Sequence, residues 1–376
     1  MGDRPSPVGP RGLALVAGAA VLLLAASLAA VLLLPGLSGG PAGTPTSGIA
    51  AGEGFLCDPN EAASLTPFLD GVVLVATDRV ARLDLSGRTL WSVPLSFSSP
   101  VAAVSGGRLL VHDEGGFLAA LFDADGLVWQ VETEGHLDGA TVSASGHVVL
   151  LSEETGYKGV IAVHAPDGAF LYAWKSAETG YLLSAAADPT GTRVDVSALY
   201  TDGASARPVM RSFSLSGQSL AQKTLDAGDA LPLVLFDEMG RTALCGESAV
   251  VAFQAGQRAG EVAYRIDRAG LRTVLATDEG LVLVRASDDG AGTVASRIRN
   301  GTEGPACALP AAPSAVASRG GRLAAASGSA VDLVDLAKGT VEERMTFAEE
   351  VLALGFADDR HLIVVTKGAV RRVDVS

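Results

Sequence analysis

The sequence has few of the residues that build reactive or metal-binding sites. Its 376 residues include only three cysteines, five histidines and 5% aromatic residues. Cys57, Cys245 and Cys307 allow at most one disulfide, and their spacing does not select a pair. The alternative interpretation is that they are three small, partly buried apolar side chains. The histidines are scattered, with no pair at the spacing of metal ligands, so the sequence predicts no metal centre.

Catalytic motifs are also missing. No serine occupies a Gly-x-Ser-x-Gly elbow followed by a helix, and no glycine-rich loop precedes a helix to hold phosphate. The formal net charge is −14. The first 35 residues contain Arg4 and Arg11 against Asp3, so the rest of the chain carries −15. A domain with this much negative charge is a poor candidate for binding nucleic acid or anionic lipid headgroups.

A long apolar segment is present near the N-terminus. Residues Leu13 to Leu34 are Leu, Ala, Val, Gly and one Ser, without a single ionisable side chain. As a helix this segment spans about 33 Å at about 1.5 Å per residue, close to the thickness of a bilayer core. We therefore expect a transmembrane helix at 13–34. A cleaved signal peptide, with its cleavage site near Ser38 to Gly43, is the alternative.

The flanks of this segment predict its orientation. Two arginines precede it, and no charged residue follows it until Glu53. Because positive flanks stay in the cytoplasm, residues 1–12 are expected inside and the C-terminal domain outside the plasma membrane, in a single-pass arrangement. Residues 35–51 are rich in Gly, Pro, Ser and Thr and are expected to form a flexible stalk. Residues 52–376 then form the extracytoplasmic domain.

That domain is repetitive. A short apolar strand, a tight turn ending in glycine and a second apolar strand recur along the chain, with 39, 42, 49, 39, 45 and 38 residues between successive turn glycines. A period near 40 with strands alone is typical of β-propeller blades. The turn glycines are Gly87, Gly126, Gly168, Gly217, Gly256, Gly301 and Gly339.

The last repeat is short by one strand. It supplies Val351 to Phe356, Leu362 to Thr366 and Ala369 to Val375. A strand from residues 52–58 would complete it, and pairing the two ends of the chain would close the ring. The sequence therefore predicts an all-β fold, a β-propeller of about eight four-stranded blades. Seven blades is the alternative, if the weak copy around Ile298 is an insertion.

The repeat resembles the quinoprotein-like (PQQ-type) propeller superfamily. Two units, Leu83 to Trp91 and Phe122 to Trp129, carry its strand–Asp–turn–Gly–strand–Trp pattern, and Phe170 to Trp174 is a displaced version. The superfamily includes pyrroloquinoline-quinone dehydrogenases and a non-enzymatic envelope scaffold in outer-membrane protein assembly. The three tryptophans occupy comparable places in their repeats, as residues that pack one blade on the next do.

The resemblance implies a member without a cofactor. A quinoprotein dehydrogenase would have adjacent cysteines and a calcium site of Glu, Asn and Asp. Here no two cysteines are adjacent, and asparagine occurs only at Asn60 and Asn300. The second of these begins an Asn-Gly-Thr glycosylation sequon, but Asn-Gly is also a strong hairpin turn and falls on the turn position of a repeat, which favours the turn.

Lengthened loops indicate a partner-binding face. Loops between the second and third strands grow longer in three units, at 153–159, 200–208 and 287–292. In a four-stranded meander these loops lie on the same face as the connections between blades, and binding residues concentrate on such loops. Tolerated surface insertion is the alternative. The side chains expected to gather on neighbouring blades three and four are Glu154, Tyr157, Tyr181, Tyr200, Asp202 and Arg207.

These patterns predict a binding or scaffold module of the cell envelope, not an enzyme. The module would be held at the membrane by Leu13 to Leu34 and would engage an envelope protein or glycan, without cofactor, metal or nucleic acid. The alternative is a propeller hydrolase or lyase that uses acidic residues in the central channel. A third possibility is a sensor, which would need a membrane partner because twelve residues leave no room for a signalling domain.

Overall fold

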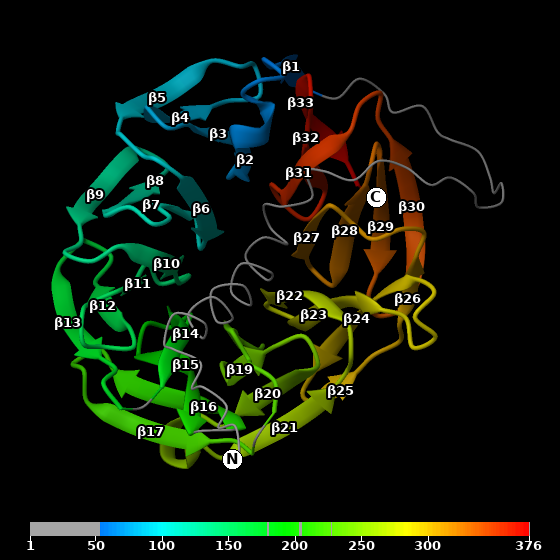
Figure 1. Cartoon of the computed structure of the whole chain (residues 1–376). Coiled ribbons are helices and arrows are strands. Elements are labelled where there is room, and N and C mark those ends of the chain that lie inside the picture. The colour runs from blue at the N-terminus through cyan, green and yellow to red at the C-terminus, as the bar shows by residue number, and fades with distance from the viewer. Residues whose placement is uncertain (1–52, 179, 203–204, 227, 376) are drawn as a thin grey trace, which may run out of the picture.

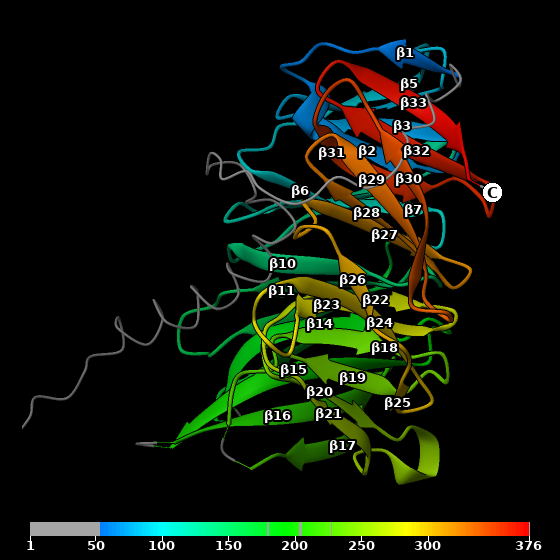
Figure 2. The same cartoon turned by 90° about the vertical axis from the view of Figure 1, so that its right-hand side faces the viewer.

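The protein is a ring of eight antiparallel β-sheets, the blades of a β-propeller (Figure 1). The computed structural model describes residues 53–178, 180–202, 205–226 and 228–375. The chain runs around the ring once, so that each blade is a meander whose first strand is innermost. Seen from the side, the ring is a disc with the strands crossing its thickness (Figure 2).

The first four blades follow one another directly. Blade 1 contains β2 (Leu65–Phe68), β3 (Gly71–Val75), β4 (Arg79–Leu83) and β5 (Thr89–Pro94). Blade 2 contains β6 (Pro100–Ser105), β7 (Arg108–Asp113), β8 (Leu118–Asp123) and β9 (Gly126–Glu132). Blade 3 contains β10 (Leu137–Val142), β11 (Val148–Ser152), β12 (Val160–His164) and β13 (Phe170–Lys175). Blade 4 contains β14 (Tyr181–Ala187), β15 (Arg193–Asp202), β16 (Ser205–Ser214) and β17 (Ser219–Thr224).

The other four complete the circle. Blade 5 contains β18 (Leu233–Phe236), β19 (Thr242–Cys245), β20 (Ala249–Phe253) and β21 (Val262–Asp267). Blade 6 contains β22 (Leu271–Thr277), β23 (Gly280–Ala286), β24 (Thr293–Arg299), β25 (Thr302–Glu303) and β26 (Cys307–Leu309). Blade 7 contains β27 (Ala315–Arg319), β28 (Arg322–Ser327), β29 (Ala330–Asp335) and β30 (Thr340–Thr346). Blade 8 contains β31 (Val351–Phe356), β32 (His361–Thr366), β33 (Ala369–Asp374) and β1 (Gly54–Leu56). Two 3-10 turns, η1 (Ala62–Ser64) and η2 (Gly256–Arg258), are the helical elements of the described residues.

The ring closes as predicted, by a strand from the beginning of the domain. Strand β1 pairs antiparallel with β33, with Phe55 opposite Val370, so the blue and red ends of the chain lie side by side in Figure 1. An ion pair of 2.9 Å between Arg372 and Glu53 extends the contact. Burial of Val370 beneath the closing strand joins blade 8 to blade 1.

The turn glycines take the conformation that the repeat requires. All seven have positive φ, from 67° at Gly256 to 127° at Gly126, and all lie between the third and fourth strands of their blades. Side chains with a Cβ atom are strained in this region, which is why glycine recurs there. In blades 1 to 5 and 7 a β-bulge follows at the same place in the ladder, and it twists the outer strand over the next blade.

Aromatic side chains on the outer strands join one blade to the next. The Trp91 ring stacks on Phe122 with centroids 5.5 Å apart, and its Nε1–H donates to the Ala124 carbonyl at 3.1 Å. Trp129 repeats this contact one blade later, with a bond of 3.3 Å to the Pro166 carbonyl. The predicted packing role of the tryptophans is therefore confirmed at both positions.

Trp174 packs between blades from a different register. Tyr172, two residues earlier, pairs with β12 as Trp129 pairs with β8, and its ring lies against Gly217 of the next blade. Trp174 instead contacts Phe213, with ring centroids 4.9 Å apart. Tyr172 thus occupies in blade 3 the position that Trp129 occupies in blade 2, and Trp174 lies two residues further along the strand.

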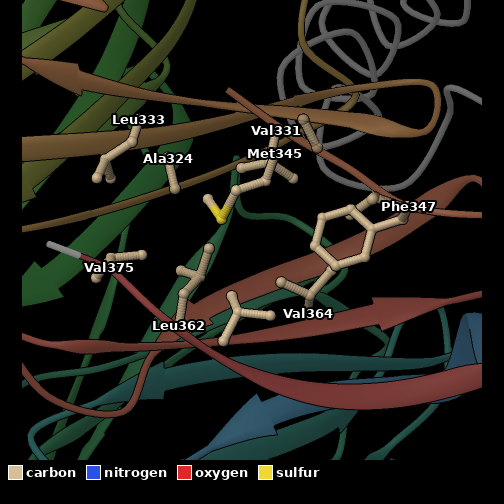
Figure 3. Close-up of a cluster of buried hydrophobic side chains, with 11 residues drawn as sticks. Ala324, Val331, Leu333, Met345, Phe347, Leu362, Val364 and Val375 are labelled. Atoms are coloured by element: carbon tan, nitrogen blue, oxygen red, sulfur yellow. The ribbon is translucent and has the colours of Figure 1, made fainter. Parts of the chain in front are cut away.

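The hydrophobic core is divided into layers between neighbouring blades. Figure 3 shows one of them, where Leu333 and Met345 of blade 7 meet Leu362 and Val364 of blade 8. Each of these side chains is at most 2% exposed. Because every blade is covered on both faces, central strands such as β3, β11 and β20 are almost continuously apolar, in contrast to the alternation of a half-exposed sheet.

The alternative of seven blades is wrong. Ile298 is fully buried in β24, so the weak repeat is blade 6 itself and no insertion. Its outer edge departs from the pattern, because β25 and β26 pair in succession with β24 and replace one continuous fourth strand. The interruption falls at Gly304 and Pro305, and proline cannot donate to a ladder.

The three cysteines carry free thiols, so the undecided disulfide does not form in this structure. Cys245 and Cys307 are buried among apolar side chains, as the alternative interpretation expected, and Cys57 is partly buried beside the closing strand. In the four ranges that the structure describes, no helix is long and apolar enough to cross a membrane. The predicted transmembrane helix at 13–34 and the stalk at 35–51 lie outside these ranges.

Candidate functional site

The meander gives the disc two different faces. One, the turn face, carries the turns between first and second strands and between third and fourth strands. The other, the loop face, carries the loops between second and third strands and the connections between blades. The six predicted residues belong to the second face, in the loop 153–159 of blade 3 and in the first three strands of blade 4. The structure thus places all six on neighbouring blades 3 and 4.

In blade 3, Lys175 contacts two of these residues, Glu154 and Tyr157. The Lys175 ammonium group lies 2.5 Å from the Glu154 carboxylate and 5.2 Å from the centre of the Tyr157 ring. The ion pair raises the pKa of Lys175, chiefly through the hydrogen bond to Glu154. Tyr157 itself is 42% exposed, which is high for an aromatic side chain. The loop therefore presents a tyrosine that a cation holds in place.

A second lysine reaches blade 4. Lys158 Nζ lies 5.4 Å from the centre of the Tyr181 ring, at the start of β14. Backbone hydrogen bonds fix the loop at the same point, since Lys158 donates to the Ser176 carbonyl at 2.7 Å and accepts from the Leu182 N–H at 3.2 Å. Cation–π contacts of this kind are worth about 0.5–1 kcal/mol at exposed sites. They orient the two tyrosines more than they stabilise the fold.

The remaining three predicted residues are on the long hairpin of blade 4. Tyr200 and Arg207 are directly opposite each other in the β15–β16 ladder. Asp202 ends β15, opposite Ser205. The hairpin continues beyond β14 and β17, whose ladders stop at Leu199 and Val209, so that the paired ends of β15 and β16 extend past these two strands (Figure 2).

Sequence reasoning missed an aromatic pair on the same face. The Phe117 ring of blade 2 lies 4.4 Å from the ring of His136 in the following connection, and Phe117 is 42% exposed. His136 Nδ1 is 2.7 Å from the Gly115 carbonyl oxygen. The only sequence signal for this pair is that Phe117 directly follows Gly115 and Gly116. The sequence alone predicts a short turn at these two glycines.

One carboxyl group near this face has an unusual pKa. Asp138, the second residue of innermost strand β10, is the one acidic residue on the innermost strands of the described chain. Partial desolvation, reinforced by the negative charge of Glu153, raises its pKa to about 6, although His136 opposes the shift. A carboxyl group in this range exchanges protons near neutral pH.

The geometry settles the conformation of the Asn-Gly sequence at 300–301. Asn300 and Gly301 have φ values of 47° and 75°, so the sequon residues form the tight turn that the repeat predicted. Within the described residues, no group of three or more His, Cys, Asp and Glu side chains is arranged to hold a metal ion.

A protein-family model matches residues 57–375, nearly the whole propeller. The chain belongs to DUF5711. The description of DUF5711 is a family of unknown function, so membership in it supplies no activity. No curated protein matches the sequence.

Solved structures support the fold of this DUF5711 chain. BamB from Moraxella catarrhalis is 13% identical, with a TM-score of 0.55 over 87% of this chain and 100% of its own. Sqt1 from Saccharomyces cerevisiae is 10% identical, with a TM-score of 0.61 over the same shares of the two chains. Both likenesses support the β-propeller fold. At these identities the likeness says nothing about ligands.

Proposed function

We propose that the protein is a membrane-anchored, extracytoplasmic binding module that acts as a scaffold in the cell envelope and performs no catalysis. Leu13 to Leu34 is its anchor in the plasma membrane, with the N-terminus in the cytoplasm. Its partner is an envelope protein or glycan, bound on the loop face of blades 3 and 4. The fold, which resembles that of BamB, is consistent with such a role.

One observation carries this proposal. The loop face holds one exposed tyrosine, Tyr157, and the half-buried Tyr181 on the next blade, and their contacts with Lys175 and Lys158 hold both rings in place. Tyrosine contributes a large contact area and loses little conformational entropy on binding, which makes it a frequent anchor of interfaces. The net charge of −14 keeps such a domain soluble and repels polyanions.

Substitution of the three loop-face tyrosines tests the proposal. We expect the triple variant Tyr157→Ala, Tyr181→Ala, Tyr200→Ala to lose the partners that crosslink to the wild-type chain in intact cells, measured by mass spectrometry. Phe170→Ala is the matched control, because this aromatic is 61% exposed but lies on the outer strand of blade 3. Retention of every partner by the triple variant would place the binding site elsewhere.

The anchor is tested in the same cells. The full chain should sediment with the membrane fraction, and its propeller should be digested by protease added outside the cytoplasm. A chain that begins at residue 36, directed to the same compartment by a cleavable signal, should be soluble. Membrane association of the shortened chain would show that the apolar segment is not the anchor.

An enzyme with a site in the central channel is the second candidate function. Asp138 favours it, since a carboxyl group with a pKa of about 6 suits a general acid of a hydrolase or lyase. Against it, the described innermost strands offer no second carboxyl group. Turnover of any screened substrate by the purified domain, abolished in Asp138→Asn, would replace the scaffold proposal.

A further inference from the structure

The binding surface continues beyond the two blades discussed so far. Leu137 exchanges backbone hydrogen bonds of 2.8 Å with Gly115 and Gly116, which joins the loop of blade 2 to the connection that follows it. The backbone N–H of Glu153 then donates to the His136 carbonyl at 3.0 Å, and the backbone N–H of Lys158 donates to the Ser176 carbonyl. Loops and connections alternate in this interlocked series from blade 2 to blade 4. Their side chains are therefore held at constant spacing.

Three ring contacts follow this series, one on each successive blade. We call their residues the aromatic strip: Phe117, His136, Tyr157, Lys158, Lys175 and Tyr181. On the loop face, Phe117 and Tyr157 are the exposed large aromatic side chains of the described residues, and they come from adjacent blades. Other aromatic residues of this face are buried, such as Phe97 and Phe347 in two further connections. The exposed aromatic side chains of the loop face thus come from adjacent blades 2 and 3, and exposed aromatic side chains that lie together mark interaction sites.

The charge of the strip differs from that of the whole molecule. Lys175 is neutralised by Glu154. Lys158 forms no ion pair within the described part of the chain and lies only over the Tyr181 ring. With a net charge of −14 on the chain, this ammonium group is a local positive centre in an acidic surface. A carboxylate from a partner would be repelled over most of the protein and attracted here.

The rings also discriminate between classes of partner. A sugar stacks on the open face of an aromatic ring, but Tyr157 and Tyr181 each have an ammonium group over one face. The Tyr157 side chain, which is 42% exposed, remains available for apolar side chains and hydrogen bonds, as in protein interfaces.

From these contacts we infer that the aromatic strip binds a protein segment, which packs an apolar side chain against Phe117 and Tyr157 and directs an Asp or Glu carboxylate to Lys158. This inference rests on the proposed binding function and gives it a chemical class of partner. It adds blade 2 to the predicted face, and it makes Lys158 the residue that determines specificity.

Site-specific photocrosslinking tests the inference. The full chain is produced in intact cells with the photoreactive residue p-benzoylphenylalanine at position 117, 157 or 170. We expect protein adducts from positions 117 and 157 and none from 170, with an Asp or Glu close to the crosslinked residue of the partner. Adding Lys158→Glu should reduce both adducts about tenfold, as expected for reversal of one interfacial charge.

Lys338→Glu is the matched control for charge reversal, because Lys338 lies on the turn face and is also exposed. It should leave the adducts unchanged. Each variant is accepted only if its thermal unfolding matches that of the parent chain.

The possible results distinguish a failure of this inference from a failure of the proposed binding function. Adducts from position 170 alone would keep a binding function but overturn the aromatic strip. Adducts that carry a glycan mass, or that survive Lys158→Glu, would overturn the acidic protein segment. No adduct from any position, together with a lack of partners for the wild-type chain, would overturn the binding function itself.

Discussion

The two faces of the propeller use the same residue types for opposite purposes. On the turn face, Tyr264 lies against Gly301 of the next blade, donates to Asp237 at 3.2 Å and has the Arg241 guanidinium 5.0 Å above its ring. On the loop face, Tyr157 also has a cation above its ring but is 42% exposed and supports no neighbouring blade. The first tyrosine contributes to stability and the second is available for binding.

The same contrast holds for turns and loops. On the turn face an aromatic side chain of the preceding blade lies within 3.1 Å of an added Cβ atom at four of the seven repeat glycines, namely Gly87, Gly168, Gly217 and Gly301. On the loop face Gly156 has the same positive φ but open space around it. The difference teaches that the repeat conserves contact between blades on one face and leaves the other free to vary in length.

The largest effect is expected from alanine at a turn-face glycine. Gly168 has a φ of 90°, and a Cβ atom there would lie 2.7 Å from Trp129 Cγ. Gly168→Ala combines the left-handed backbone strain of about 1–2 kcal/mol with overpacking of about 1–3 kcal/mol, so we expect a loss of about 3–4 kcal/mol. Urea unfolding of the purified domain measures it.

Gly156→Ala is the matched control on the loop face. Its φ is 91°, but no atom lies within 4 Å of the added Cβ. Only the backbone strain of about 1–2 kcal/mol should remain. Equal losses at the two positions would show that contact between blades contributes nothing at the turn face.

Alanine substitution of Tyr264 or Tyr157 is expected to lower the free energy of unfolding by less than Gly168→Ala does. Tyr264→Ala removes ring packing, one hydrogen bond and one cation–π contact, and should cost about 2–3 kcal/mol. Tyr157→Ala should change the free energy of unfolding by less than about 0.5 kcal/mol, like other exposed positions. The comparison fails if Tyr157→Ala destabilises the domain as much as Tyr264→Ala does, in the same urea titration.

The turn face was also the part of the molecule that sequence reasoning could predict. Its glycines recur in seven of the eight blades, so a period near 40 residues was enough to place them and to predict a closing strand from residues 52–58, which the structure has at Gly54–Leu56. Local constraints, positive φ and a short turn, act there within a few residues of sequence.

The loop face could be predicted only in outline. Loop length located the six candidate residues of blades 3 and 4, but the side chains that they contact come from other parts of the chain. Lys175 meets Glu154 across 21 residues, and Phe117 meets His136 across the connection between two blades. Such contacts depend on how blades are rotated against each other, which no local pattern encodes. The role of Asp138 depended in the same way on its place at the ring axis.

The smallest effect, and the sharpest contrast between the faces, is the pH dependence of two carboxyl groups. Asp84 on the turn face accepts hydrogen bonds from the Ser86 hydroxyl at 2.6 Å and from two backbone N–H groups, and these lower its pKa to about 2. Its stabilising contribution is present above the unfolded pKa near 4 and is lost as the pH falls through about 2.

The contribution of Asp138 to stability changes with pH in the opposite direction. With a folded pKa of about 6, it stabilises the native state fully below about pH 4, and this contribution is lost as the pH rises through about 6. Asp138→Asn should therefore raise the melting temperature at pH 7.5 relative to wild type, with the gain disappearing at pH 4. Asp84→Asn should lower it at pH 7.5, with the loss shrinking toward pH 2. Thermal unfolding at these pH values measures both, and shifts of the same sign would remove the electrostatic difference between the faces.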